Sequence, residues 1–189
     1  MKKLKKRFIV PAVVFILGMC ALIGTTYAVC KGQEQQNRTK AKLNAMTYTE
    51  RIYGELMEGI GVTDSLKQVV ISGDGNINRV YDIAANMMDD SIQSIQIAPN
   101  GVVTEIYPEE SNESSKIDLI NDSDRGEISR YARDNDTVIM QGPFELKQGG
   151  YGIAVRNPVY LEDENGKKSF WGFTIVIMKV PEIFSDSVE

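Results

Sequence analysis

An uninterrupted apolar run near the N-terminus constrains this chain more than any other feature. Residues 8–29 contain no charged side chain and a single proline. As a helix, the run would be about 33 Å long, enough to cross the roughly 30 Å hydrocarbon core of a bilayer. Five cations and no acid precede it: Lys2, Lys3, Lys5, Lys6 and Arg7. Cationic flanks stay in the cytoplasm, so the sequence predicts a cytoplasmic basic tail at 1–7, a transmembrane anchor at 8–29 and an extracytoplasmic remainder.

A cleaved signal peptide is the alternative interpretation of this run. Thr26-Tyr27-Ala28 is a tolerable cleavage site, with small residues at its ends. The run is, however, longer than the apolar core of a typical signal peptide. Val29 before Cys30 also makes a poor lipoprotein cleavage site. The sequence therefore favours an uncleaved, single-pass anchor in the cell membrane.

Charge and residue content exclude several classes of function. Beyond the basic tail, 16 Lys and Arg stand against 26 Asp and Glu, so nucleic acid is not an expected partner, because phosphate binding depends on clustered cations. No histidine occurs, which removes serine–histidine triads and most zinc sites. The turn at 72–76 carries Asp74 and Asn76 but lacks the later acidic ligands of a calcium loop. We expect no catalytic residue, no metal, no cofactor and no enzymatic activity.

The two cysteines do not form a recognisable framework. Cys20 lies inside the apolar run and Cys30 at its outer end. Cys30 is either an idle thiol or the site of an intermolecular disulfide across a dimer.

Residues 30–92 are predicted to form a helical stalk and further helices. Apolar residues at 43, 46, 53, 56 and 60 share one helix face, which indicates either a homodimer contact or packing on the chain's own domain. Gly59 and Gly61 are expected to loosen this helix, and Thr63 or Asp64 to cap a second one after it. Residues 77–88 carry a third apolar stripe.

From residue 91 the apolar period changes from helix to strand. Residues 91–98 and 102–107 flank Pro99-Asn100-Gly101, which predicts a hairpin. Two short helices are expected at 116–120 and 124–133, the second started by Ser123 or Asp124. Three strands follow at 137–140, 150–160 and 169–179. The order predicts an α+β domain in which an antiparallel sheet carries helices on one face.

Several motifs in this region occur together and in a characteristic order. They include Ile97-Ala98-Pro99-Asn100-Gly101-Val102, Gly142-Pro143-Phe144-Glu145-Leu146, Gly149-Gly150-Tyr151-Gly152, Arg156-Asn157-Pro158-Val159-Tyr160 and Phe170-Trp171-Gly172-Phe173. With them, residues 95–184 resemble the bacterial form of the CHASE sensor domain.

The resemblance implies a PAS-like core, here residues 93–180, that lies outside the membrane between two transmembrane helices and senses a small molecule. It also implies a cytoplasmic output, usually a histidine kinase or a cyclic-dinucleotide cyclase or phosphodiesterase. Residues 181–189 would lead toward the second membrane helix, and the sequence ends there. The chain is therefore expected to be a fragment of a receptor or an orphan sensor without an output.

A ligand site is predicted around Arg156. Strand alternation places Arg156 on the same face as Gly152 and Ala154; small side chains there leave room, and the guanidinium suits an anionic or carbonyl ligand. Further candidate lining residues are Tyr107, Tyr151 and Trp171. The structural alternatives are a salt bridge from Arg156 to Asp118 or Glu145 and a core position for the tryptophan.

These observations favour the small-molecule-sensing input module of a membrane signalling receptor. A stand-alone membrane-anchored binding or adaptor protein is the alternative, and a tethered extracellular enzyme is the weaker one, because no nucleophile–base pair is evident.

Overall fold

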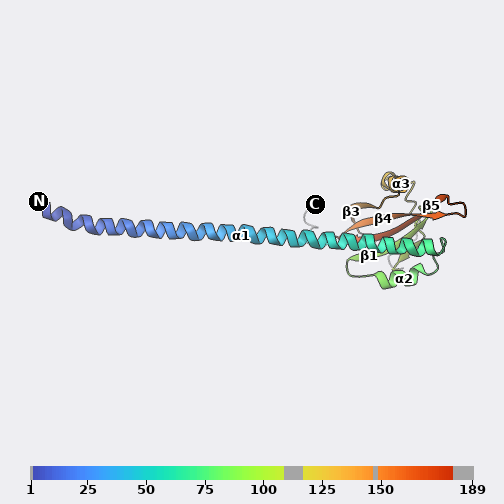
Figure 1. Cartoon of the computed structure of the whole chain (residues 1–189), viewed down its shortest axis with the longest axis horizontal. Helices are drawn as coiled ribbons and strands as arrows, with labels where there is room; N and C mark the ends of the chain where they lie inside the picture. The colour runs from blue at the N-terminus through green and yellow to red at the C-terminus, as the bar shows by residue number, and fades with distance from the viewer. Residues whose placement is uncertain (1, 109–116, 147–148, 181–189) are drawn as a thin grey trace. The chain divides into compact units, whose positions relative to one another are not determined.

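The computed structural model describes residues 2–108, 117–146 and 149–180 (Figure 1). The chain divides into two compact units, Met1–Ile52 and Tyr53–Glu189. Helix α1 (Lys2–Ser72) runs through the first unit into the second. The second unit adds α2 (Val80–Met87), α3 (Gly126–Asn135) and five strands.

The membrane-length helix is present in the first unit. Apolar side chains along it are exposed, including Phe15 at 68% and Leu22 at 67%. Its most apolar 18-residue window has a mean hydropathy of 2.3. Within the part of the chain that the structure describes, α1 is the one helix that is long and apolar enough to cross a membrane.

The predicted helix break at Gly59 and Gly61 is wrong, since α1 continues through both to Ser72. At Gly59, a Cβ would collide with the sulfur of Met178, so the missing side chain lets the helix approach strand β5 (Lys168–Lys179) closely. Thr63 and Asp64 are not caps. The Thr63 carbonyl accepts a hydrogen bond from Thr174 Oγ1 at 2.9 Å, and Asp64 Oδ1 accepts one from the side chain of Asn157 on strand β4 (Tyr151–Glu162).

The five strands form one antiparallel sheet in the order β2-β1-β5-β4-β3. Their bounds are β1 Ile92–Pro99, β2 Glu105–Tyr107, β3 Ile139–Glu145, β4 Tyr151–Glu162 and β5 Lys168–Lys179. The hairpin between β1 and β2 turns at Asn100 and Gly101, whose φ angles of 54° and 82° suit this residue pair. The PAS-like α+β architecture predicted from the sequence is thereby confirmed.

One face of the sheet packs against α1 and α2. This core contains Leu66 and Val70 of α1, Val80 and Ala84 of α2, and, from the sheet, Ile92, Ile95, Ile97, Val155, Val159, Val176 and Met178. We call it the α1/α2 face.

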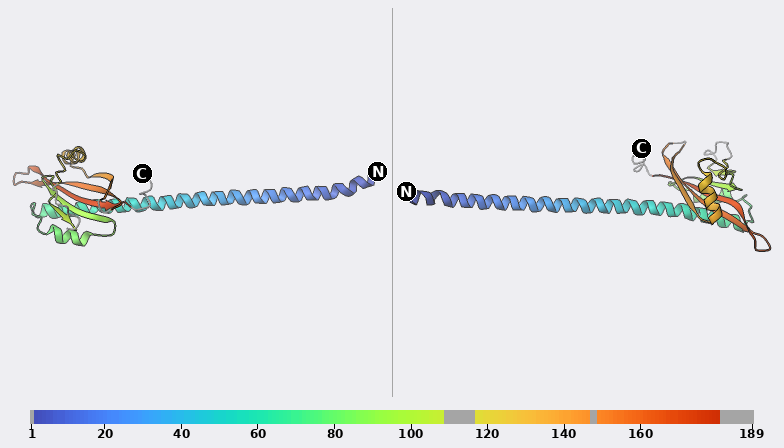
Figure 2. Two further views of the ribbon diagram at one scale, coloured as in Figure 1. Left: turned by 180° about the vertical axis from the view of Figure 1, so that it is seen from behind. Right: turned by 90° about the horizontal axis from the view of Figure 1, so that it is seen from above.

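The opposite face packs against α3 and the loop before it. Ala132 of α3 meets a second core that includes Ala98, Ala154, Phe173, Ile175 and Ile177. Helices therefore cover both faces, not one as expected, and the left view of Figure 2 shows α3, in yellow, and α2, in green, on opposite sides of the strands. We call this second surface the α3 face.

The loop before α3 differs from its predicted form. Residues 117–120 are not helical: Asp118 forms an isolated bridge with Val102 instead; Lys116 lies outside the described residues. Helix α3 is preceded not by a Ser123 or Asp124 cap but by a turn at Asp122, whose Oδ1 accepts the backbone N–H groups of Asp124 and Arg125, both at 2.9 Å.

Candidate ligand-binding site

Arg156 is a cation buried in the α3 face of β4. Only 3% of the residue is exposed. One terminal nitrogen donates a hydrogen bond to Gln141 Oε1 at 2.6 Å, and Nε has no hydrogen-bond partner among the described residues. A buried donor left without an acceptor costs about 1–3 kcal/mol. The guanidinium is therefore short of acceptors where the structure describes its surroundings.

Burial disfavours the charged form of this side chain. It lowers the pKa of Arg156 to about 10, and the positive charge of Arg125 acts in the same direction, whereas Asp122 opposes it. A pKa of about 10 still leaves the guanidinium protonated at neutral pH. The α3 face thus holds a charged group in a place of low polarity, where an anion interacts most strongly with it.

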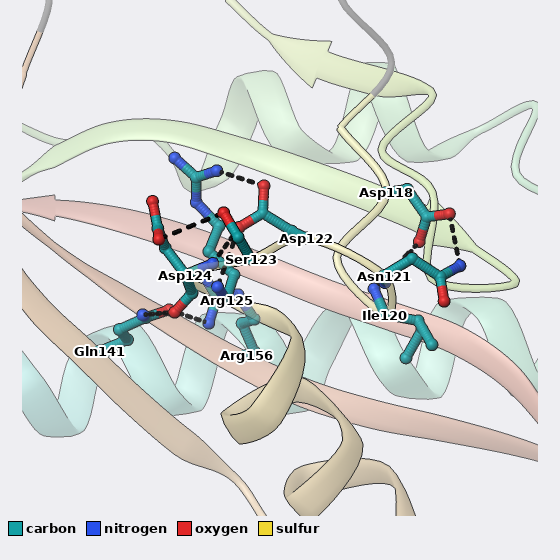
Figure 3. Close-up of polar contacts among 9 residues, drawn as sticks. All are labelled: Asp118, Ile120, Asn121, Asp122, Ser123, Asp124, Arg125, Gln141 and Arg156. Atoms are coloured by element: carbon teal, nitrogen blue, oxygen red, sulfur yellow. Dashed lines mark hydrogen bonds and ion pairs between the residues drawn. The ribbon is translucent and has the colours of Figure 1, made fainter.

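The polar neighbours of Arg156 come from β3 and from the turn before α3 (Figure 3). Gln141 on β3, which orients the guanidinium, is itself held by a hydrogen bond from its Nε2 to the carbonyl of Asp124, 3.1 Å away. Arg125 pairs with Asp122 at 2.9 Å. The turn therefore supplies one carbonyl and one carboxylate that is already paired, and none of the residues shown forms an ion pair with Arg156.

The structural alternative for Arg156 is not what the structure shows. Neither Asp118 nor Glu145 pairs with it among the described contacts. The carboxylate of Asp118 instead accepts hydrogen bonds from the backbone of Ile120 and from the backbone and side chain of Asn121, at 2.8–3.1 Å. These hydrogen bonds, with that from the Asn121 side chain foremost, lower the pKa of Asp118.

Three of the six predicted site residues share the α3 face: Gly152, Ala154 and Arg156. Ala154 belongs to the core beneath α3 and is 1% exposed. The space beside Gly152 is occupied, because a Cβ there would lie 2.7 Å from the Leu146 side chain. The small residues therefore accommodate neighbouring side chains, and the polar chemistry of this face resides in Arg156.

The other three lie on the α1/α2 face. Tyr107 and Trp171 pack against the core formed with α1 and α2, and alternation along β4 places Tyr151 on that side as well. The indole of Trp171 lies against the turn after α1, where a Cβ on Gly75 would be 2.7 Å from its Nε1. The structure thus divides the predicted set between the two faces of the sheet.

Sequence reasoning missed a polar network directly behind Arg156. Asn157, 1% exposed, points to the α1/α2 face and donates from Nδ2 to Asp64 Oδ1 at 2.6 Å. Lys67 of α1 donates to Asn157 Oδ1 at 3.3 Å and pairs with Asp136 after α3 at 3.5 Å. The sequence does show Asn157 beside Arg156 in a predicted strand, which is a signal for a polar site. The partners of Asn157, however, lie about ninety residues earlier in the chain.

Among the described residues, no group of three or more His, Cys, Asp or Glu side chains is arranged to hold a metal ion. What the α3 face offers chemically is a buried guanidinium, a group whose N–H donors suit acceptors and anions.

Three comparisons place the chain among known proteins. Curated proteins gave no match. Among solved structures, the chain is similar to an extracellular ligand binding receptor from Desulfohalobium retbaense DSM5692, with a TM-score of 0.55 and 11% identity. That alignment covers 72% of this chain and 24% of the receptor, and it bears on the fold alone. The sequence model of the CHASE domain matches residues 71–189, nearly the whole of the sheet-bearing unit, and this chain therefore belongs to the CHASE domain family.

Proposed function

We propose that this chain is the extracytoplasmic sensing input of a membrane signalling receptor, and that its small-molecule ligand binds at Arg156. Family membership and the PAS-like fold support the sensing role. The observation that carries the site is a guanidinium that is buried, charged and without a carboxylate partner among the described residues. Burial of this charge destabilises the fold, and the single hydrogen bond to Gln141 offsets that cost only in part. In a sensor, the same group provides a fixed contact for a ligand.

The ligand carries a carboxylate, a phosphate or a strongly accepting carbonyl. A charge-assisted hydrogen bond to Arg156 contributes about 1.5–3 kcal/mol, or roughly 10–150-fold in affinity. Gly152 and Ala154 belong to the same face and remain part of the proposed site.

A binding screen on the purified full chain in detergent tests this proposal. Acetate, benzoate, succinate and inorganic phosphate are compared with neutral acetamide and benzamide by thermal shift. At least one anion should raise the melting temperature, its neutral analogue should not, and Arg156→Ala should abolish the effect while the unliganded domain stays folded. Arg130→Ala, which removes an exposed arginine of α3, is the matched control. Anion stabilisation that survives in Arg156→Ala would place the site elsewhere.

The N-terminal helix is proposed as an uncleaved anchor with the sensor outside the cell. The five cations before the apolar run support this orientation. A reporter fused after Glu189 should be active outside the cell and remain in the membrane fraction; release of a shortened soluble product would favour a signal peptide. The proposed output is a cytoplasmic histidine kinase or a cyclic-dinucleotide cyclase or phosphodiesterase. If no such output domain exists, the alternative function is that of a membrane-anchored binding or adaptor protein.

A homodimer through the stalk is also proposed. Leu43, Met46 and Tyr53 of the predicted stripe are 57%, 50% and 61% exposed, whereas Leu56 and Ile60 pack against the core of the second unit. The exposed part of the stripe is therefore free to meet a second copy. Sedimentation of the full chain in detergent, with Cys30 cross-linking in membranes, should report a dimer; a strict monomer in both experiments would rule it out.

A further inference from the structure

A cavity lies on the α1/α2 face, on the other side of the sheet from Arg156. It measures about 150 Å³ and is bounded by α2 and by strands β1 and β2. The partly exposed Tyr81 and the exposed Glu105 are among its lining residues, so the cavity is accessible from solvent. A concave, largely apolar space with a few polar groups is the usual form of a small-molecule site.

The floor and one wall of this cavity are apolar. Ile95 and Ile97 of β1 are 2% and 1% exposed and form part of the core beneath it. From α2, Val80, Tyr81 and Ala84 line the cavity, and Ala84, 1% exposed, has the smallest side chain of the three. An alanine at this position leaves the volume that a leucine would fill. An apolar cavity of roughly 150 Å³ is large enough to hold a benzene ring.

Two aromatic rings form another wall. Tyr81 of α2 and Tyr107 of β2 meet edge to face, with ring centroids 4.8 Å apart and planes at 82°. The faces of tyrosine rings attract cations as well as apolar groups.

The one charged residue that lines the cavity is Glu105. It stands opposite Ile97 in the β1–β2 register, and Tyr107 stands opposite Ile95, so both side chains leave the edge strand on the cavity side. Glu105 is exposed, and no hydrogen bond or ion pair of its carboxylate is recorded with the described residues. The cavity thus combines an apolar floor, two tyrosine rings, the polar Asn78 and a carboxylate at its edge. This combination suits an apolar ring that bears an ammonium group.

We infer that the cavity between α2 and the β1–β2 hairpin binds a small aromatic amine, with its ring over Ile95 and Ile97 and its ammonium at Glu105. This site is independent of the proposed anion site at Arg156, because the two lie on opposite faces of the sheet. A single domain would then read two ligands of opposite charge.

Benzylamine is the probe that tests this inference, and benzyl alcohol is its neutral match. Titrated into the full chain in detergent by calorimetry, benzylamine should bind about tenfold more tightly than benzyl alcohol, as one charge-assisted hydrogen bond implies. Glu105→Gln should remove that tenfold difference, and it should leave the fold intact because Glu105 is exposed. Glu105→Lys should reverse it in favour of phenylacetate. Ala84→Leu should fill the cavity and abolish binding of both probes.

Arg156→Ala separates this site from the anion site, because it should leave benzylamine affinity unchanged. Loss of benzylamine binding in Arg156→Ala alone would show that the amine occupies the α3 face and would overturn the inference. So would equal affinities for benzylamine and benzyl alcohol, an affinity unaffected by Glu105→Gln, or no binding at all. If Ala84→Leu fails to fold, the two Glu105 variants still decide the matter.

Discussion

Replacing Arg156 with methionine removes a buried charge for which the described residues supply no carboxylate. Methionine keeps a long, flexible side chain and fills similar space. The fall in the pKa of Arg156 from its ordinary value to about 10 corresponds to a cost of about 3 kcal/mol for the charged form in the folded state, at roughly 1.4 kcal/mol per unit. The lost hydrogen bond to Gln141 offsets about 1.5 kcal/mol of this. We therefore expect Arg156→Met to stabilise the unliganded domain by about 1–2 kcal/mol.

The assay is urea unfolding of the full chain in detergent, followed by the fluorescence of Trp171, the single tryptophan. Near neutral pH the variant should unfold at a higher urea concentration with an unchanged slope. The sign of the pH dependence follows from the lowered pKa. Burial of the cation destabilises the folded state below a pH of about 10, and this destabilisation disappears as pH rises from there toward the ordinary pKa of an arginine. The advantage of the variant should therefore shrink above a pH of about 10.

Arg38→Met is the matched control, because the Arg38 side chain is 80% exposed and pairs only with Glu34 one turn away. It should change the unfolding free energy little, as exposed ion pairs do. If Arg156→Met instead lowers the unfolding free energy by more than about 1 kcal/mol, the guanidinium is a net stabiliser of the fold, and the reasoning behind the ligand site is refuted.

Two further predictions concern helix α1. Gly61→Ala should raise the unfolding free energy by up to about 1 kcal/mol, because nothing lies within 4 Å of the new Cβ, whereas Gly59→Ala should not, because Met178 occupies that space; equal gains from both in urea unfolding would contradict the close helix–strand contact. Asp64→Ala should lower the unfolding free energy by about 1–3 kcal/mol, because it leaves the buried Nδ2 of Asn157 without its acceptor, and no loss in the same assay would show that this hydrogen bond is dispensable.

Local patterns predicted the strands well and the helix ends poorly. The alternation and turn residues of 91–107 and the long apolar run of β5 are properties of the chain itself, and the sheet follows from them. The break expected at Gly59 and Gly61 rested on helix propensity, which costs only about 1 kcal/mol per glycine. Packing of Leu66 and Val70 against the sheet outweighs it.

Of the candidate site, only the part that lies on strand β4 was predictable from the sequence. Alternation put Gly152, Ala154 and Arg156 on one face because they lie on the same regular stretch of β4. It failed for Trp171, which has no partner across β4: Val159 pairs with Gly172 and Tyr160 with Phe170. The extra residue of this bulge turns to the α1/α2 face.

The partner of Arg156 was hidden for the same reason. In the β3–β4 register, Ile139 stands opposite Arg156 and Gln141 stands two residues further along, just before the pairing shifts toward Phe144. The contact between Gln141 and Arg156 therefore depends on how the two strands are aligned. Such offsets between strands do not appear in any local pattern of the sequence.

Arg156 and Asn157 are consecutive residues that serve opposite sides of the sheet, the first beneath α3 and the second against α1. They share a peptide bond, which is planar and stiff. A ligand that tilts or shifts this peptide from the Arg156 side also moves the backbone of Asn157. The side-chain amide of Asn157 is hydrogen-bonded to Asp64 and Lys67 on the other side of the sheet. Signal transfer across the domain then needs no chain of intermediate side chains: its shortest path is one covalent link.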